Sequence, residues 1–391
     1  MFVRTLFKLM ADSQASDLFF TAGAPVQIKI KGEVVPLDEK ILDAATLKTI
    51  TYEAMNEEQI ARFERDLEIN FSLGERGIGS FRVNIFKQRG ACGMVIRHIK
   101  AEIPSVESLN LPQTLKDVVM EKRGLVLVVG STGSGKSSTL AAMINHRNHT
   151  QSGHILTIED PIEFIYKHAK SIVNQREVGI DTRTYHNALV NAMREAPDVI
   201  LIGECRDRET FGAALQYAQT GHLCLSTIHA NNSYYALNRI INLFPHEART
   251  SLLMDLAVSL KAIISQRLVH DVNGDIIPAV ELMVNTKHIQ ELIKDGEIDR
   301  IKEAMEQSLS PGSQTFEQAL FRLYQSGKIT LEEAMGNSDS PTNLHWLINN
   351  AAKAASPAQT AANMASGAAS SRPATPQTDL SSIKLNLDAL G

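Results

Sequence analysis

The sequence predicts an α/β protein with more than one domain. The chain has 391 residues, more than one ordinary domain needs, and 43% of them are apolar, enough for a buried core. The first hundred residues mix short strand and helix patterns, whereas apolar runs between Gly124 and Ala230 alternate with helical stretches. Apolar runs without polar alternation are typical of parallel strands covered on both faces.

Residues 1–100 are expected to form an N-terminal α+β domain. The start, MFVRTLFKLM, predicts a short amphipathic helix rather than a secretion signal or a membrane span. PVQIKIKGEVVPL alternates apolar and polar residues around Lys31-Gly32, which predicts a hairpin, and GSFRVNIFKQRGACGMVIRHIK predicts two further strands. Residues 101–113 contain two prolines and are expected to be a linker.

Residues 114–350 are expected to form a second domain with a parallel sheet. Its predicted strands are GLVLVVG, GHILTIED, PDVILIGE and GHLCLSTIHA, and residues 246–350 are expected to be mostly helical. Residues 351–391 are expected to form a tail, because Ala, Ser, Pro, Thr and Gln dominate it; residues 352–380 are predicted to be disordered. The terminal LSSIKLNLDALG is apolar again, which fits an amphipathic tail or a short docking peptide.

The composition weighs against several classes of function. A net charge of −5 and 5% aromatic residues, with no basic stripe, argue against a nucleic-acid translocase. Three cysteines without a CxxC pair argue against a disulfide framework or structural zinc and favour a reducing, cytoplasmic compartment.

The segment GSTGSGKS matches the phosphate-binding pattern G-x-x-x-x-G-K-[ST] between a predicted strand and a helix. Its glycines let several N–H groups converge on one anion, and the following helix adds its positive end. Lys136 is expected to neutralise the β- and γ-phosphates of ATP, and Ser137 to bind Mg²⁺. The predicted nucleotide-binding residues are Gly130, Ser131, Thr132, Gly133, Ser134, Gly135, Lys136, Ser137 and Ser138.

Carboxylates follow two of the predicted strands. Glu204 follows PDVILIG, where it can activate water or hold Mg²⁺; the alternative is a surface glutamate beside Asp207, which is placed to cap the next helix. Glu159, Asp160 and Glu163 crowd the end of HILTIEDPIEF, where a solvated acidic turn is the alternative to a site for Mg²⁺ or water. Glu163 is the first candidate for the general base.

Two histidines flank the predicted strand in TGHLCLSTIHAN. His229 lies at the end where strand ends meet the nucleotide and is a candidate sensor of the γ-phosphate. His222 precedes the strand and is a further candidate nucleotide contact. The alternative for each is a satisfied structural histidine.

Hydrolysis also needs positive charge on the transferred phosphate. Arg82 and Arg97 lie on strand patterns of the first domain and are candidate arginine fingers that one subunit presses onto a nucleotide. Arg194 and Arg206 are weaker candidates. The alternative for the strand arginines is a solvated or salt-bridged outer face.

These segments carry a resemblance to a known family. GSTGSGKS, TIEDPIE, DVILIGECRD and TGHLCLSTIHA, in this order and spacing, resemble the Walker A, Asp box, Walker B and His box of the secretion ATPase superfamily. ASDLFFTAGAPVQIKIKGEV and FRVNIFKQRG resemble the N-terminal domain of its type IV pilus retraction ATPases, the PilT/PilU family. The resemblance covers about residues 1–350. It implies a PAS-like domain, then a RecA-like P-loop ATPase domain with a helical C-terminal part.

The resemblance also implies a function and partners. It implies a homohexameric ATPase at the cytoplasmic face of the inner membrane, which turns a pilus platform protein and retracts pili for twitching motility. Lys136, Glu163, Glu204, His222 and His229 match family motif positions, and Arg82 and Arg97 match first-domain arginines.

The sequence also indicates which branch of the family the chain resembles. The chain lacks the extra N-terminal domain and four-cysteine zinc module of the assembly ATPases, so it resembles the retraction branch. KHIQELIKDGEID keeps only fragments of the principal motor's C-terminal motif, which favours the accessory branch that acts with a paralogous retraction ATPase. The alternative function is an ATP-gated adaptor that couples the principal motor to the platform with little hydrolysis of its own.

Overall fold

The computed structural model describes residues 2–30, 32–75, 78–99, 102–308 and 310–354. Its chain divides into two compact units. Of the described residues, the first unit contains those up to Glu102 and the short segment Glu163–Ile165, and the second contains Ile103–Ile162 and those between Tyr166 and Ala354. None of the described helices is both long and apolar enough to cross a bilayer.

The first unit is built on a six-stranded antiparallel sheet with the strand order β3-β2-β1-β6-β5-β4. Its elements are α1 (Phe2–Asp12), β1 (Asp17–Thr21), β2 (Gln27–Ile30), β3 (Glu33–Pro36), α2 (Ala44–Glu53), α3 (Glu57–Asp66), β4 (Glu68–Glu75), β5 (Gly79–Gln88) and β6 (Ala91–Ile99). The predicted hairpin is confirmed as β2–β3, although Lys31 in its turn lies outside the described residues.

The core of the first unit follows the alternation in its sequence. Phe81, Val83 and Ile85 of β5 are buried, and the residues between them are only half-buried. The predicted amphipathic helix is confirmed as α1, whose Phe7 ring stacks on Phe81 with the centroids 3.9 Å apart. Helix α1 therefore packs on one face of the sheet.

The second unit contains a seven-stranded sheet with the order β13-β12-β7-β11-β10-β8-β9. Only the β12–β13 pair is antiparallel. The strands are β7 (Gly124–Val129), β8 (Gly153–Glu159), β9 (Ser171–Glu177), β10 (Val199–Ile202), β11 (Leu223–Ile228), β12 (Leu260–His270) and β13 (Ile276–Val284). Every residue of β7, β10 and β11 is buried, as expected for parallel strands covered on both faces.

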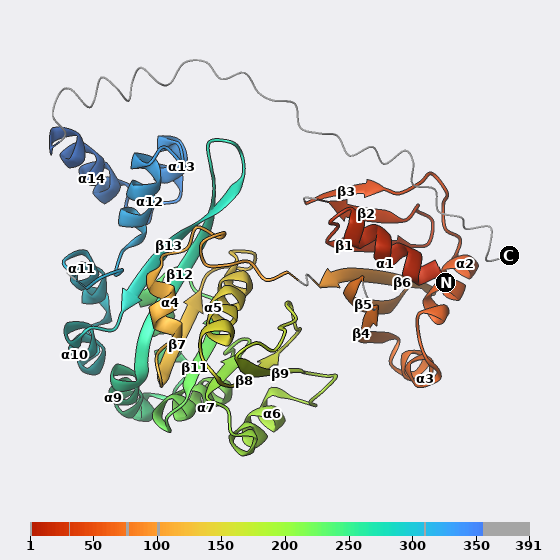
Figure 1. The fold of residues 1–391 in the computed structure, drawn as a ribbon, viewed down its shortest axis with the longest axis horizontal. Coiled ribbons are helices and arrows are strands. Elements are labelled where there is room, and N and C mark those ends of the chain that lie inside the picture. The colour runs from red at the N-terminus through yellow and green to blue at the C-terminus, as the bar shows by residue number, and fades with distance from the viewer. Residues whose placement is uncertain (1, 31, 76–77, 100–101, 309, 355–391) are drawn as a thin grey trace. The chain divides into compact units, whose positions relative to one another are not determined.

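The helices of this unit connect and cover the sheet (Figure 1). They are α4 (Thr114–Val119), α5 (Lys136–Thr150), α6 (Tyr185–Ala192), α7 (Arg208–Gln219), α8 (Ser233–Asn242), α9 (Arg249–Ser259), α10 (Lys287–Asp295), α11 (Ile301–Glu306), α12 (Phe316–Gln325), α13 (Leu331–Gly336) and α14 (Pro341–Ala354). The predicted cap of α7 is confirmed, since Asp207 accepts a hydrogen bond of 2.8 Å from the Thr210 backbone N–H.

The expectation of a mostly helical segment at 246–350 is wrong for residues 260–284. These residues form the β12–β13 hairpin, which turns at Asn273-Gly274 with a φ of 86° at the glycine. An Asn-Gly pair between β-branched runs is a strong short-range hairpin signal. The helical interpretation overlooked it, and so missed the strand that borders β7.

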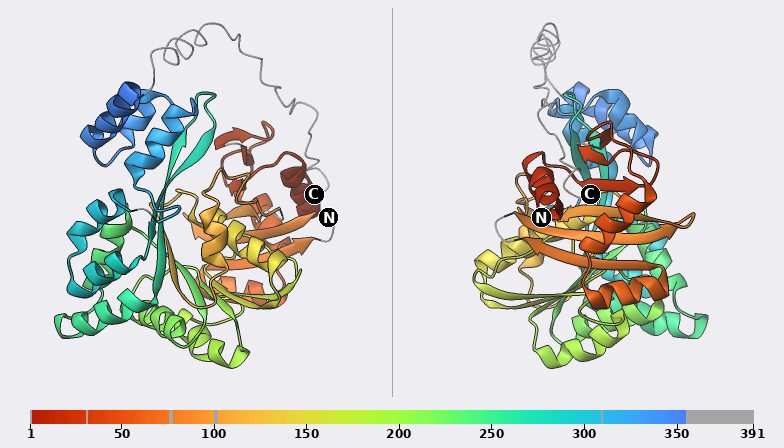
Figure 2. Two further views of the ribbon diagram at one scale, coloured as in Figure 1. Left: turned by 60° about the vertical axis from the view of Figure 1, so that its left-hand side comes forward. Right: turned by 90° about the vertical axis from the view of Figure 1, so that its right-hand side faces the viewer.

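The C-terminal helices form a small cluster of their own. Figures 1 and 2 show α12–α14 (blue) beside the turn end of the β12–β13 hairpin. A separate apolar core joins them to the hairpin; it consists of Val269, Ala279, Phe316, Leu320, Ile329, Ala334 and Leu344. Helix α14 continues to Ala354, and the rest of the predicted tail, with LSSIKLNLDALG, lies outside the described residues.

Candidate active site

The phosphate loop, residues 130–135, joins the end of β7 to the start of α5. Gly135 has a φ of 87°, which an L side chain rarely adopts, and a Cβ there would lie 2.7 Å from Gln266 Nε2. A Cβ on Gly130 would lie 2.7 Å from the backbone oxygen of Gln266. The loop therefore packs directly against β12, and both glycines fixed by the pattern, Gly130 and Gly135, are required by this close approach.

Lys136 begins α5 and is buried. Its Nζ donates hydrogen bonds to the backbone oxygens of Gly130 (2.9 Å) and Ser131 (2.7 Å), and it lies 3.5 Å from His229 Nδ1. An ammonium group has donors only, so this contact requires His229 Nδ1 to be the acceptor. The proton of a neutral His229 is then on Nε2.

His229 Nε2 faces a carboxylate. It lies 3.2 Å from Glu204 Oε1, and the other oxygen of Glu204 accepts a hydrogen bond of 2.7 Å from Arg206 Nε. The hydrogen bond and charge of Glu204 raise the pKa of Arg206. Lys136, His229, Glu204 and Arg206 thus form one chain of polar contacts, called here the lysine–glutamate chain.

Parallel pairing explains how these residues meet. Strands β10 and β11 run parallel to each other, and β11 runs parallel to β7, so their carboxyl ends share one edge of the sheet. Glu204 follows β10, His229 follows β11 and the phosphate loop follows β7. The structure therefore brings together Glu204, His229 and the phosphate loop, all of which the sequence predicted to be parts of the site.

The phosphate loop fits a nucleotide. Ser134 Oγ is buried and, among the described residues, has no hydrogen-bond partner. A cavity of about 300 Å³ runs along residues 130–134, and its remaining lining residues are Asn231, Gln266, Arg267, Leu268 and Asn337. Donors, close-approach glycines and a buried lysine suit the phosphates of ATP.

The same residues are compatible with Mg²⁺. Within the described ranges, no group of three or more His, Cys, Asp or Glu could hold a metal. Mg²⁺ bound with a nucleotide usually takes one or two protein oxygens and completes its shell with phosphate and water. Ser137 and Glu204 remain the predicted protein ligands.

In the acidic turn after β8, the carboxylate of Glu159 already accepts hydrogen bonds from neighbouring side chains. Glu159 Oε1 accepts hydrogen bonds from Thr157 Oγ1 (2.6 Å) and Gln175 Nε2 (3.2 Å). Glu163 is exposed and belongs to the first unit, so its role as general base stays a prediction.

Sequence reasoning missed Tyr185 at this edge of the sheet. A Cβ on Gly203 would lie 3.0 Å from the Tyr185 hydroxyl, which places that hydroxyl against the turn before Glu204. Burial, and then the charge of Asp160, raise the pKa of Tyr185 well above its usual range. A neutral tyrosine therefore stands between the two acidic turns; no sequence pattern marked it.

His222 does not join the lysine–glutamate chain. Its backbone oxygen accepts from the N–H of Gly124, the first residue of β7, whereas the phosphate loop follows the last residue of that strand. Its Nδ1 lies 3.2 Å from the backbone oxygen of Tyr217. Its position does not support a nucleotide contact within this unit, because His222 precedes β11 and the loop lies at the opposite edge.

The candidate arginine fingers lie on the sheet of the first unit. Arg82 of β5 and Arg97 of β6 are directly opposite one another, and Arg97 also faces Asp17 of β1. Arg97 Nε lies 2.8 Å from Asp17 Oδ1, the salt-bridged alternative for a strand arginine. Contact of either arginine with a nucleotide stays a prediction, and Arg194 is exposed.

Comparisons with known proteins match this architecture. Residues 2–290 match the family described as type II/IV secretion system protein. The chain is 47% identical over 344 residues to the type IV pilus ATPase PilU of Pseudomonas aeruginosa, covering 88% of this chain and 90% of that protein. It is 39% identical over 341 residues to the type IV pilus retraction ATPase PilT of the same organism, covering 87% and 99%.

Solved structures agree. The crystal structure of the pilus retraction motor PilT with bound ADP has a TM-score of 0.82 and 41% identity, covering 88% of this chain and 99% of that one. The ATPase DotB of Legionella pneumophila has a TM-score of 0.72 and 25% identity, covering 85% and 94%. The predicted order of an antiparallel-sheet domain, a mainly parallel ATPase sheet and C-terminal helices is confirmed by this likeness.

Proposed function

The chain belongs to the family of type II/IV secretion system proteins, and from this premise we propose that it is a motor that turns ATP hydrolysis into pilus retraction and twitching motility. It is a type IV pilus ATPase related to the PilU and PilT retraction motors. The lysine–glutamate chain beside the phosphate loop is the observation that carries the proposal. It joins the phosphate-binding group after β7 to the acid after β10, and β11, which ends before His229, lies between these two strands.

The proposed roles follow from the contacts. Lys136 turns donors from the backbone oxygens of Gly130 and Ser131 to phosphate oxygens and keeps its contact with His229. His229 in turn reports the phosphate to Glu204 through its two ring nitrogens. Both oxygens of Glu204 already have partners, so Glu204 is better suited to orient water or a metal-bound water than to accept a proton first. Glu163, which is exposed, remains the first candidate for the general base.

Bound Mg²⁺ would neutralise charge on the phosphates. Ser137 and Glu204 are the residues proposed to hold it. Arg82 and Arg97 are proposed to reach a nucleotide from the first unit of a subunit in a homohexamer.

The proposed setting is the cytoplasmic face of the inner membrane. There the hexamer acts on a pilus platform protein. Identity to PilU (47%) exceeds identity to PilT (39%), which supports an accessory role beside a paralogous retraction ATPase.

Lys136→Ala tests the central assignment. We expect the purified full chain to lose measurable Mg-ATP hydrolysis, because the substitution removes the only side-chain ammonium on the phosphate loop. Lys122→Ala is the matched control, since Lys122 is exposed and precedes β7 at its other end. Undiminished turnover in the Lys136 variant would remove the proposed function.

Glu204→Ala separates a motor from an adaptor. A motor loses both turnover and pilus retraction when the acid beside His229 is removed. Retraction that survives after turnover is lost would favour a nucleotide-gated adaptor. The measurement is pilus retraction in cells alongside hydrolysis by the purified variant.

A further inference from the structure

We propose that Arg267 is a positioning residue for ATP hydrolysis, which ties the loop carrying His229 to the C-terminal helices. This inference rests on the role proposed above for His229. The histidine loop is residues 229–232, between β11 and α8, and the C-terminal segment is residues 337–340, between α13 and α14. These residues are far apart in the sequence, and the side chain of Arg267 joins them.

Arg267 holds both segments with one guanidinium. Its Nη2 donates to the backbone oxygen of Asn231 (3.3 Å) and pairs with Asp339 Oδ1, and its Nη1 donates to the backbone oxygen of Asn337 (2.6 Å). Its Cζ lies 4.0 Å from the centre of the Phe316 ring on α12. A planar group with several fixed donors can hold three acceptors and a ring at once, which a lysine cannot.

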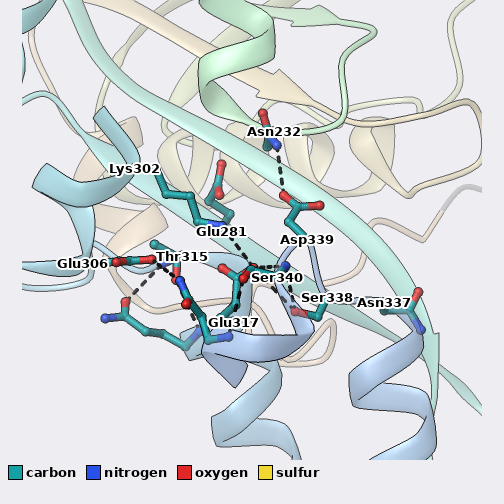
Figure 3. A network of polar contacts seen from close by, with 12 residues as sticks. Asn232, Glu281, Lys302, Glu306, Thr315, Glu317, Asn337, Ser338, Asp339 and Ser340 are labelled. Atoms are coloured by element: carbon teal, nitrogen blue, oxygen red, sulfur yellow. Dashed lines mark hydrogen bonds and ion pairs between the residues drawn. The ribbon is translucent and has the colours of Figure 1, made fainter. Parts of the chain in front are cut away.

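Asp339 makes a second connection to the histidine loop. Its Oδ2 accepts a hydrogen bond of 2.9 Å from the side-chain amide of Asn232 (Figure 3). Asn232 is fully buried, and its Oδ1 accepts from the Tyr235 backbone N–H to cap α8. The histidine loop is therefore held to the C-terminal segment at both Asn231 and Asn232.

The C-terminal segment is itself fixed by a buried carboxylate. Glu317 of α12 has 2% of its surface exposed, and its Oε1 accepts from the Ser340 backbone N–H (2.8 Å) and lies 3.2 Å from Lys302 Nζ of α11 (Figure 3). A buried charge with a fixed partner resists displacement, because losing the partner leaves the charge unpaired. Ser340, the residue after Asp339, is therefore tied to α12 and α11 through Glu317.

The residue before Arg267 contacts the phosphate loop. Gln266 is buried, and its Oε1 accepts a hydrogen bond of 2.6 Å from Thr139 Oγ1 of α5. Gln266 and Arg267 are adjacent residues of β12. Gln266 thus contacts α5, and Arg267 contacts the histidine loop. Loss of Arg267 leaves the Gln266 contact in place, so we expect nucleotide binding to persist while hydrolysis suffers.

Steady-state kinetics of the purified full chain test the proposal. We expect Arg267→Ala to lower kcat roughly tenfold or more while KM for Mg-ATP changes less than about threefold. We expect Asp339→Ala to lower kcat as well, and the double variant to lose less than the product of the two single losses, since both single variants remove the Arg267–Asp339 ion pair. Arg300→Ala is the matched control, because Arg300 is largely exposed and pairs only with neighbouring Glu297 among its described contacts.

Arg267→Lys is a second variant that keeps the positive charge. It tests the proposal even if the Arg267→Ala protein does not fold. It cannot reproduce the three-way contact, so a kcat below the wild-type value with unchanged thermal unfolding is expected. Wild-type kcat in a folded Arg267 variant would overturn the inference. The inference would also be overturned if the loss of kcat in the double variant equalled the product of the two single losses. A loss of kcat that occurs only in variants with a lowered unfolding temperature would overturn it as well. If Lys136→Ala is inactive and Arg267→Lys is normal, only this inference fails; if Lys136→Ala is active, the proposed function fails.

Discussion

The phosphate loop and the rim formed by Asn231, Arg267 and Asn337 border the same cavity but are built in opposite ways. The loop is one continuous segment whose shape depends on its glycines and on the strand and helix beside it. The rim is assembled from segments that lie more than a hundred residues apart from end to end. A local pattern encodes the first, and only long-range packing produces the second.

Gly135→Ala is expected to have the largest effect, because it breaks the local side of this comparison. The new methyl group would occupy a backbone with a φ of 87° and lie 2.7 Å from Gln266 Nε2, whose amide cannot easily move because Thr139 holds it. Strain and overpacking of this kind cost about 1–3 kcal/mol each, so we expect roughly a 100-fold loss of nucleotide affinity. Equilibrium binding of a fluorescent ATP analogue measures it.

Gly212→Ala is the matched control for that substitution. Gly212 lies in α7, where a Cβ would meet nothing within 4 Å, so the variant is expected to gain up to about 1 kcal/mol of stability and bind nucleotide normally. Equal affinities for the two alanine variants would show that the loop tolerates side chains and that its glycines are not required.

Thr139→Val tests the contact between α5, which follows the phosphate loop, and β12, which carries Arg267 of the rim. It removes the donor to Gln266 Oε1 from a fully buried position and leaves that oxygen without its 2.6 Å partner. An unsatisfied buried acceptor costs about 1–3 kcal/mol, and we expect the free energy of unfolding to fall by that amount. Chemical denaturation measures it, with Thr150→Val of the same helix as the control, since its hydroxyl is exposed. A smaller loss than in the control would mean that the contact does not stabilise the fold.

Glu281→Gln has the smallest expected effect and probes the rim through pH. Glu281 is buried, and its Oε1 accepts from the Ser233 N–H (2.8 Å) and hydroxyl (2.7 Å) at the start of α8 and from Ser265 Oγ (3.1 Å). Burial raises its pKa, and the hydrogen bonds from Ser233 and Ser265 oppose that rise.

The sign of the pH effect follows from the direction of that shift. A folded-state pKa above the usual value of 4.5 means that the protonated form favours folding, so this stability is complete below pH 4.5 and is lost as the pH rises through the folded pKa. The difference in unfolding free energy between wild type and Glu281→Gln should therefore shrink or reverse as the pH rises. Glu332→Gln, at an exposed position, is the control variant. A pH-independent difference would contradict the raised folded-state pKa of Glu281.

Much of the fold and part of the site could be predicted from the sequence. The apolar runs of β7, β8, β10 and β11 predict a parallel sheet, and parallel strands place Glu204 and His229 at the edge where the phosphate loop lies. The β12–β13 hairpin lies in the segment predicted to be mostly helical, although its Asn273-Gly274 turn is a hairpin signal. That error hid Gln266 and Arg267, the residues that connect the loop with the rim.

His222 shows how one strand separates two candidate residues that are close in the sequence. It lies seven residues before His229, close in the sequence, but a strand separates the two and puts them at opposite edges of the sheet. A six-residue strand spans on the order of 20 Å, which separates the two histidines, and a nucleotide contact of His222 stays a prediction.

The sequence by itself determined the chemistry of phosphate binding, because a glycine-rich turn between a strand and a helix needs only its own residues to present amides and Lys136 to an anion. It also determined which strands are buried, through their unbroken apolar runs. Only the tertiary structure decided that Lys136 touches His229, that His229 touches Glu204, and that Arg267 joins the histidine loop to α12–α14. These contacts depend on strand order and side-chain packing, which no single segment of the chain encodes.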